Sequence, residues 1–177
     1  MSGLGNITAL ILAGGFGTRI KDLLGDLPKP MAPVNGKPFI EWMVRWLKAQ
    51  GLRDIIISAG YRAEVLEEHF RALPVPEMNV CCINESEPMG TGGGLAYAAN
   101  ASAQEPDRWL VLNGDSLIFV QLDLLASALS DAQGVIVTRT VSDTSRYGSV
   151  RIDKSDRIID FGEKQPGTGQ INGGVYL

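Results

Sequence analysis

The chain has 177 residues, of which 45% are hydrophobic and 20% are charged. This composition excludes an intrinsically disordered protein and supplies enough apolar side chains for one α/β core, so we expect a single domain over residues 1–177. The net charge of −4 argues against a nucleic-acid partner, because binding to a polyanion needs clustered lysine and arginine. The N-terminus lacks the pattern of a signal peptide, and no apolar run approaches the roughly 18 residues of a membrane span. We therefore expect a cytoplasmic protein with no membrane partner.

Apolar runs with strand character alternate with stretches of helical periodicity along most of the chain. We expect strands at residues 8–13, 54–59, 80–83, 109–112 and 135–140, and helices near 39–50, 63–73, 92–100 and 122–130. This alternation is the pattern of βαβ units and predicts a largely parallel sheet. From residue 149 the pattern changes to short alternating runs at 149–152, 157–161 and 171–177, which predict a β-rich C-terminal portion.

The helix near residues 39–50 has one apolar stripe and a clear end. Gly51 follows its last turn, where glycine is favoured because it adopts a left-handed conformation without strain. Trp42 and Trp46 lie beside the stripe and either widen the packed face or form a subunit contact. The stripe itself consists of Phe39, Ile40, Met43, Val44 and Leu47.

The first strand leads directly into a glycine-rich turn that ends in a cation, Ala13-Gly14-Gly15-Phe16-Gly17-Thr18-Arg19. Glycines belong at such a turn because a phosphate can approach the main chain closely only where no side chain intervenes. Bare N–H groups and an arginine then bind the phosphate oxygens. The turn lacks the third glycine of a dinucleotide fold and the Gly-Lys-Ser/Thr of a P-loop. The pattern therefore predicts a nucleotide site of another kind, with a tight turn that binds no ligand as the alternative.

Together with further segments, this turn resembles the nucleotidyltransferase family that joins sugar 1-phosphates to nucleoside triphosphates. Within that family, residues 26–38 are most similar to D-glycero-α-D-manno-heptose 1-phosphate guanylyltransferases, with muramate 1-phosphate uridylyltransferases and mannose 1-phosphate guanylyltransferases as neighbours. The segments that carry the resemblance are Leu12 to Arg19, Leu27-Pro28-Lys29-Pro30, Gly90-Thr91-Gly92-Gly93-Gly94, Leu112-Asn113-Gly114-Asp115, Tyr147-Gly148, Phe161-Gly162-Glu163-Lys164 and Ile171-Asn172-Gly173-Gly174-Val175.

The resemblance implies a Rossmann-like fold of the GT-A type: a mixed, mostly parallel sheet flanked by helices, with a β-rich C-terminal portion on the sugar side. It implies nucleotidyl transfer from a nucleoside triphosphate, best matched by GTP, to a sugar 1-phosphate, best matched by the heptose. The products are a nucleotide sugar and pyrophosphate. Uridylyl transfer, guanylyl transfer to mannose 1-phosphate, and a non-catalytic nucleotide-sugar-binding protein are the alternatives. A glycosyltransferase of related fold is disfavoured, because Asn113-Gly114-Asp115 stands where an Asp-x-Asp metal motif belongs.

Three residues would carry the chemistry. By resemblance, Arg19 would bind the triphosphate and the departing pyrophosphate, and Lys29 would reach the phosphates at the reacting centre; a structural salt bridge is the alternative for either. Asp115 follows an apolar run and should stand at the carboxyl end of a strand, where open α/β sheets bind ligands. A carboxylate there suits Mg²⁺, the expected cofactor. Asp115 could instead form a turn or cap a helix.

Glu85 matches the family position that reads the nucleobase. A carboxylate only accepts hydrogen bonds, and guanine offers two neighbouring donors where uracil offers one, which favours GTP. Gly90 would let the main chain approach the ring. A solvated loop carboxylate is the alternative for Glu85, and it is the preferred interpretation of Glu87. The full set of predicted nucleotide-binding residues is Leu12, Ala13, Gly14, Gly15, Gly17, Thr18, Arg19, Glu85, Gly90, Thr91 and Asn113.

Gly148, Glu163, Lys164 and Asn172 match family positions that contact the sugar and its phosphate. A carboxylate and an amide accept hydrogen bonds from hydroxyls, and a lysine binds phosphate as a point charge. Exposed residues of a β-hairpin are the alternative. The segment Lys164-Gln165-Pro166 departs from the family, which more often has proline directly after the lysine.

The family also implies what lies around the site. Its members continue past Asn172 and supply a second aspartate to the metal, so we expect the domain to be C-terminally incomplete; a homo-oligomer stays open.

Cys81 and Cys82 are adjacent in a strand, which points them to opposite faces and prevents a bridge, and they are interpreted as small buried side chains. His69 has no second histidine to form a metal site and is interpreted as a boundary residue.

Overall fold

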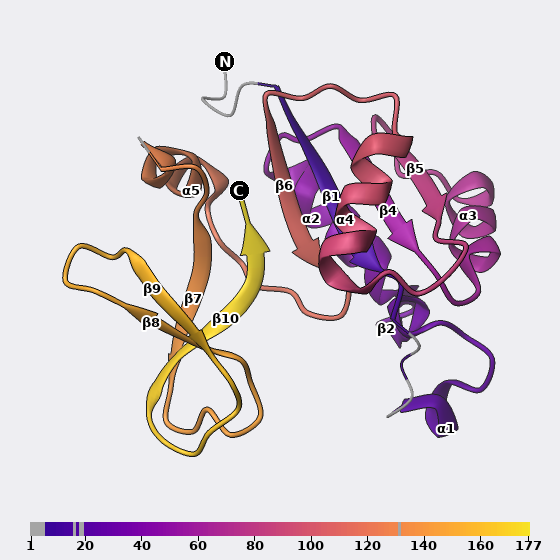
Figure 1. The fold of residues 1–177 in the computed structure, drawn as a ribbon. Coiled ribbons are helices and arrows are strands. Elements are labelled where there is room, and N and C mark those ends of the chain that lie inside the picture. The colour runs from indigo at the N-terminus through magenta and orange to yellow at the C-terminus, as the bar shows by residue number, and fades with distance from the viewer. Residues whose placement is uncertain (1–5, 16, 18–19, 131) are drawn as a thin grey trace.

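The computed structural model describes residues 6–15, 17, 20–130 and 132–177. Within them, eight strands form one sheet in the order β5-β4-β1-β6-β10-β8-β9, with β7 paired to β10 (Figure 1). The strands are β1 (Ile7–Ala13), β4 (Asp54–Ala59), β5 (Asn79–Asn84), β6 (Arg108–Asn113), β7 (Ile136–Val141), β8 (Ser149–Ile152), β9 (Ile158–Gly162) and β10 (Gly169–Tyr176). The main helices are α2 (Phe39–Ala49), α3 (Ala63–Ala72), α4 (Gly90–Ala101) and α5 (Leu122–Leu129). The predicted α/β fold, mostly parallel in its first part, is confirmed.

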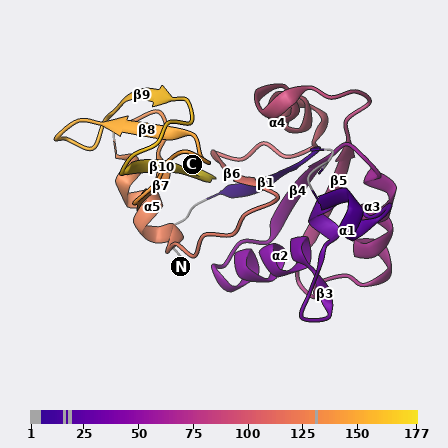
Figure 2. The same ribbon diagram turned by 90° about the horizontal axis from the view of Figure 1, so that it is seen from below.

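The parallel half of the sheet consists of β5, β4, β1 and β6. Because side chains alternate between the faces of a strand, the two faces carry separate sets of apolar residues. Ile11 and Ile57 lie in the larger cluster with residues of α2 and α3, whereas Leu10 and Ile56 pack with Ala98 of α4. Figure 2 shows the resulting layers, with α4 on one face and α2 and α3 on the other.

Helix α2 follows its predicted stripe and ends as predicted. Gly51 has a φ of +91°, and the N–H groups of Gly51 and Leu52 donate to the carbonyls of Lys48 and Leu47 at 2.9 and 3.1 Å. These two bonds satisfy carbonyl groups that the helix end leaves without partners. Trp42 donates its ring N–H to the carbonyl of Val34 at 2.8 Å, and Trp46 makes an edge contact with Phe119. Both contacts support the packing interpretation of the tryptophans.

Glu41 is a charged residue on the buried face of α2, and the sequence pattern does not predict its burial. It is 4% exposed, and its carboxylate pairs with Arg45 at 2.7 Å, with Lys37 at 3.1 Å and with His69 at 3.0 Å. Burial acts to raise the pKa of Glu41, but the hydrogen bonds from Arg45, Lys37 and His69 outweigh it and hold this pKa below its ordinary value of 4.5. The cluster ties α2 to α3 and to the short strand that contains Lys37.

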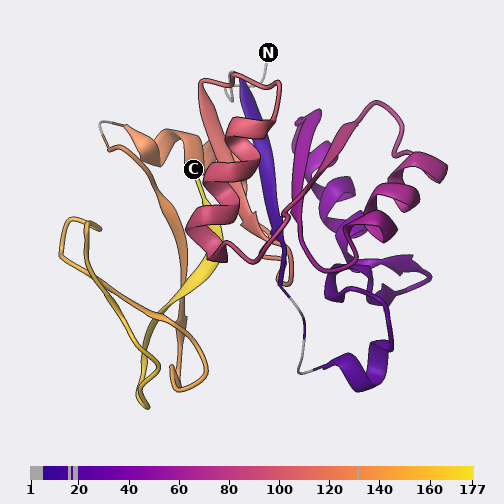
Figure 3. The same cartoon turned by 45° about the vertical axis from the view of Figure 1, so that its right-hand side comes forward.

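The C-terminal half of the sheet is antiparallel. Strand β10 pairs antiparallel with β6, β7 and β8, and β8 pairs antiparallel with β9. The run at residues 135–140 does form a strand, but β7 does not continue the parallel order, because it pairs with β10 instead. Figures 1 and 3 show β7 to β10, in orange and yellow, on the side of the molecule away from α3. The β-rich C-terminal portion is thus confirmed.

Short elements between β1 and α2 complete the described part of the chain. They are α1 (Lys21–Leu24), the 3-10 helix η2 (Lys29–Met31), and the strands β2 (Pro33–Val34) and β3 (Lys37–Pro38), which pair antiparallel. In the described ranges, none of the helices is both long and apolar enough to cross a bilayer.

Candidate nucleotide-binding and active site

A cleft of about 620 Å³ lies at the carboxyl ends of β1 and β6, the edge at which parallel α/β sheets bind ligands. It brings together every predicted nucleotide-binding or catalytic residue that the structure describes: Leu12, Ala13, Gly14, Gly15, Gly17, Lys29, Glu85, Gly90, Thr91, Asn113 and Asp115. Thr18 and Arg19 lie outside the described residues. Ile20, Pro30, Pro88, Met89 and Gly114 also line the cleft and were not predicted.

Two glycines of the first turn are required by close contacts. At Gly14, an added Cβ would lie 2.6 Å from Oε1 of Glu85. Gly17 has a φ of +59°, and its added Cβ would lie 2.9 Å from Cβ of Lys29. Since L-residues rarely adopt such a φ, position 17 beside Lys29 favours glycine. Gly14 and Gly15 also line the cleft.

Lys29 and Asp115 meet across the cleft. The Nζ of Lys29 lies 2.5 Å from Oδ2 of Asp115, and the two side chains are 35% and 50% exposed. Lys29 begins η2, where the N–H of Met31 donates to the carbonyl of Pro28 at 2.8 Å. Because exposed ion pairs contribute only about 0–1 kcal/mol, this pair can exchange for anionic and cationic ligands at little cost.

Asp115 is placed by the end of β6. The N–H of Gly114 donates to the carbonyl of Leu12 at 2.8 Å, which binds the turn after β6 to β1. A Cβ at Gly114 would lie 2.7 Å from that same carbonyl oxygen. Asn113, at the last position of β6, packs its side-chain amide against Gly174 of β10. Asp115 thus stands at the carboxyl end of the strand, as predicted.

Glu85 points into the protein as well as lining the cleft. Its Oε1 accepts a hydrogen bond from Oγ of Ser58 at 2.6 Å, and its N–H donates to the carbonyl of Ala59 at 2.7 Å. Ser58 is fully buried on β4. Sequence reasoning missed Ser58 because a serine inside an apolar strand belongs to no motif.

Three of the four predicted sugar-phosphate residues lie in one row across the antiparallel strands. Ser149 is aligned with Ile171 of β10 on one side and with Gly162 of β9 on the other. The next positions along these strands are Gly148, Asn172 and Glu163, and the N–H of Asn172 donates to the carbonyl of Gly148 at 3.0 Å. Lys164 directly follows Glu163, and both are exposed.

Asn172 is held by its own strand. Its Nδ2 donates to the hydroxyl of Tyr176 at 2.7 Å, and its Oδ1 accepts from the N–H of Gly174 at 2.8 Å. The register of β10 shifts between Asn172 and Tyr176. This irregular segment connects the row of sugar-phosphate candidates to Asn113 in the nucleotide cleft.

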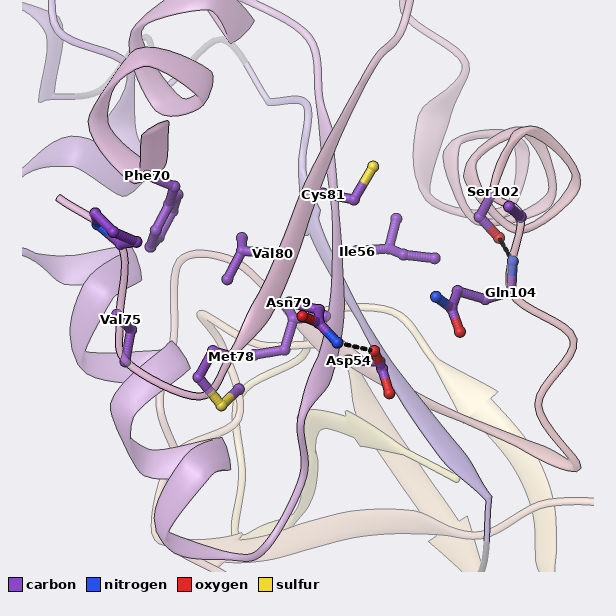
Figure 4. Close-up of a pocket in the computed structure, with 13 residues that line it drawn as sticks. Asp54, Ile56, Phe70, Val75, Met78, Asn79, Val80, Cys81, Ser102 and Gln104 are labelled. Carbon is purple, nitrogen blue, oxygen red and sulfur yellow. Dashed lines mark hydrogen bonds between the residues drawn. The ribbon is translucent and has the colours of Figure 1, made fainter. Parts of the chain in front are cut away.

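A second cavity, of about 450 Å³, lies at the opposite end of the strands, beside the first residues of β4 and β5 (Figure 4). Asp54 accepts a hydrogen bond from Asn79 there, at 2.8 Å. No predicted site residue lines this cavity. Phe70 and Val80 lie on one side of β5, and Cys81 lies on the other.

The two cysteines are free, as predicted, but Cys81 is exposed and Cys82 is only half-buried. The expectation that Cys81 is a buried side chain is wrong: it is exposed, because β5 is an edge strand and Cys81 faces the second cavity. Burial, with smaller contributions from Cys81 and Glu67, raises the pKa of Cys82 to about 12. His69 is 11% exposed and pairs with Glu41, in agreement with its interpretation as a boundary residue.

A family model described as Nucleotidyl transferase matches residues 8–177. The chain is 39% identical over 170 residues to a D-glycero-alpha-D-manno-heptose 1-phosphate guanylyltransferase of Campylobacter jejuni, a match that covers 96% of this chain and 74% of the relative. It is 36% identical over 177 residues to a mannose-1-phosphate guanyltransferase of Schizosaccharomyces pombe, covering 96% of this chain and 48% of that relative.

Among solved structures, HddC from Yersinia pseudotuberculosis complexed with GMP-PN matches with a TM-score of 0.81 and 36% identity, over 96% of this chain and 75% of that one. The family model and these identities agree with the arrangement of the glycine turn, Lys29 and Asp115 around one cleft. The chain belongs to the nucleotidyl transferase family.

Proposed function

We propose that the protein transfers the guanylyl group of GTP to D-glycero-α-D-manno-heptose 1-phosphate and releases pyrophosphate. The observation that carries this proposal is the cleft itself, in which the glycine turn, Lys29 and Asp115 converge at the carboxyl ends of two parallel strands. The name of the similar protein from Campylobacter jejuni supports the heptose and the guanylyl group. Supply of GTP favours the cytoplasm as the place of this reaction.

The reaction is an in-line displacement at the α-phosphorus of the triphosphate. An oxygen of the sugar phosphate attacks that phosphorus, the bond to the bridging oxygen breaks, and pyrophosphate leaves with the electron pair. Because both reactants are anions, the protein's main tasks are alignment and charge neutralisation. Main-chain groups of Gly14, Gly15 and Gly17 would hold the triphosphate, with Arg19 as an added cation. Lys29 would move from Asp115 to the oxygens on which charge develops.

Asp115 is the residue that would hold Mg²⁺. In the described part of the chain, we find no group of three or more histidine, cysteine, aspartate or glutamate side chains that could together hold a metal ion. A single half-exposed carboxylate beside a phosphate site still fits Mg²⁺, which takes one or two carboxylates together with substrate phosphates and water. When bound, the ion would neutralise charge on the phosphate oxygens.

The sugar phosphate would bind along the row formed by Gly148, Glu163 and Asn172. The exposed carboxylate of Glu163 suits sugar hydroxyls, which are hydrogen-bond donors, and the neighbouring Lys164 suits the phosphate. Glu85 supports guanine, because its carboxylate can accept from two adjacent donors on the purine edge. The positions of these residues and the chemistry of their side chains together support both the sugar-phosphate assignment and the guanine assignment.

Pyrophosphate release tests this function directly. The purified chain with Mg²⁺ would be given GTP, UTP or ATP, each with the heptose 1-phosphate, mannose 1-phosphate or no sugar phosphate. We expect release to be fastest with GTP and the heptose, to require the sugar phosphate and to stop in EDTA. Binding of GTP without release from any pair would contradict catalysis. Fastest release with UTP, or with mannose 1-phosphate, would contradict the proposed base or the proposed sugar.

A further inference from the structure

We propose that Ser58 is a positioning residue for recognition of the nucleobase. Its buried hydroxyl holds one oxygen of the Glu85 carboxylate in a slot formed by Ser58, Gly14 and Gly94, so that the carboxylate faces the base in a fixed orientation. This inference rests on the proposed function, in which Glu85 meets guanine, and it assigns a specificity role to a residue outside the cleft lining.

The hydroxyl of Ser58 donates a hydrogen bond to the carboxylate of Glu85. It lies 2.6 Å from Oε1 of Glu85 and 3.3 Å from the carbonyl oxygen of Gly94. A hydroxyl has one proton to donate, and both the shorter distance and the negative charge favour Glu85 as the acceptor. Ser58 is 0% exposed, so water does not compete for this hydrogen bond. Position 58 faces α4, on the same side of β4 as Ile56.

Two glycines form the walls of the slot. An added Cβ would lie 2.6 Å from Oε1 of Glu85 at Gly14 and 2.8 Å from it at Gly94. Real Cβ atoms do not approach this closely, so the carboxylate occupies space that only glycine leaves free. The main chain of Glu85 is fixed as well, through its hydrogen bond to Ala59. Glu85 is therefore held at its backbone and at the tip of its side chain.

This arrangement leaves acceptor capacity for a base. A carboxylate has about four lone-pair positions, and Ser58 uses one of them on Oε1. Among the residues that the structure describes, no further hydrogen bond to this carboxylate is found, so the other positions could accept from N1–H and from the 2-amino group of guanine. Because Glu85 is already ordered, binding need not restrict a flexible side chain, and such preorganisation strengthens binding. A glutamate without Ser58 would be free to adopt other rotamers and would discriminate less well between bases.

A double-mutant cycle tests the inference. The dissociation constants of GTP, UTP and ITP would be measured by calorimetry for the wild type, Ser58→Ala, Glu85→Ala and the double variant. ITP lacks the 2-amino group, so its comparison with GTP reports the contact to that group. We expect Ser58→Ala to weaken GTP about tenfold, as for loss of a hydrogen bond to a charged group. It should also reduce the preference for GTP over ITP. In the Glu85→Ala background, the same change should weaken GTP binding by less than about twofold, because the effects of substituting two coupled residues are not additive.

Thr8→Val is the matched control, since Thr8 is also a buried hydroxyl residue of the sheet, at the opposite end of β1. It should leave all three dissociation constants unchanged. Ser58→Cys retains a small side chain with a weak donor and should fall between the wild type and Ser58→Ala, which keeps the test valid if the alanine variant fails to fold.

Equal losses from Ser58→Ala in both backgrounds, or no loss in either, would overturn the role of Ser58. A wild type that binds GTP with the predicted coupling but releases no pyrophosphate would contradict the proposed function and leave this role intact.

Discussion

In the parallel half of the sheet, neighbouring residues hold the residues predicted for the nucleotide in place. In the antiparallel half, strand register aligns the residues predicted for the sugar phosphate, and most of these are exposed. Gly14 has no room for a Cβ beside Glu85, and the carboxylate of Glu85 accepts a hydrogen bond from the buried hydroxyl of Ser58. Glu163 and Lys164, by contrast, follow the exposed strand β9. The difference leads us to expect that the proposed nucleotide site is rigid and that the proposed sugar side tolerates substitution.

The largest effect is expected at the reacting centre. Lys29→Met should lower kcat about 100- to 1000-fold, because it removes a preorganised charge from the transition state. Rates of pyrophosphate release at saturating GTP would measure it. Lys48→Met is the control, since Lys48 binds Glu77 and the carbonyl of Pro76 on the surface, and it should keep the wild-type rate. A Lys29→Met variant with near-normal turnover would remove Lys29 from the chemistry.

The next effect concerns the stability of the parallel half. Glu41→Gln should lower the free energy of unfolding by about 3 kcal/mol, because it removes the buried negative charge that pairs with Arg45, Lys37 and His69. Urea unfolding at pH 7 would measure this loss. In Glu67→Gln, where only an exposed pair with Arg71 is lost, the change should stay within about 0.5 kcal/mol.

The same glutamate predicts a pH dependence. Since the pKa of Glu41 is lowered from 4.5, its ionised form stabilises the fold above that pH, and this contribution is lost as pH falls through the lowered pKa. The free energy of unfolding should therefore fall less steeply in acid for Glu41→Gln than for the wild type. Identical acid profiles for the two proteins would contradict this account of the cluster.

A smaller effect is expected in the nucleotide turn. Gly14→Ala places a methyl group 2.6 Å from Oε1 of Glu85 and should weaken GTP binding about tenfold, the cost of overpacking a rigid site. The control Gly92→Ala meets no heavy atom within 4 Å and should bind GTP normally. If Gly14→Ala also bound GTP normally, the nucleotide site would not be rigid.

The smallest effect is expected on the sugar side. Lys164→Met should raise the KM for the sugar 1-phosphate about three- to tenfold, the range for loss of a solvated contact to phosphate, and leave the KM for GTP unchanged. Lys154→Met, in the turn between β8 and β9, should change neither constant. An increase in the KM for GTP alone would reverse the proposed division between the two halves.

The sequence predicted those features that regular patterns of residues encode. Strands and helices followed from apolar periodicity, and the cleft residues followed from the glycine turn and the family motifs. The gathering of these residues in one cleft agrees with the prediction, and their individual roles stay predictions. The antiparallel pairing of β7 was not predicted, because strand direction depends on distant partners rather than on local pattern. Ser58 and Glu41 were missed for a related reason. Each is polar within an apolar element, and its partners lie on other elements.

A crystal structure of the chain with GTP and Mg²⁺ would test the central claim most directly. The account predicts the triphosphate against Gly14, Gly15 and Gly17, the ion at Asp115, and the guanine edge at Glu85 with Ser58 still bound to its carboxylate. GTP bound in the cavity beside Asp54 and Asn79, with the cleft between Lys29 and Glu85 empty, would contradict it.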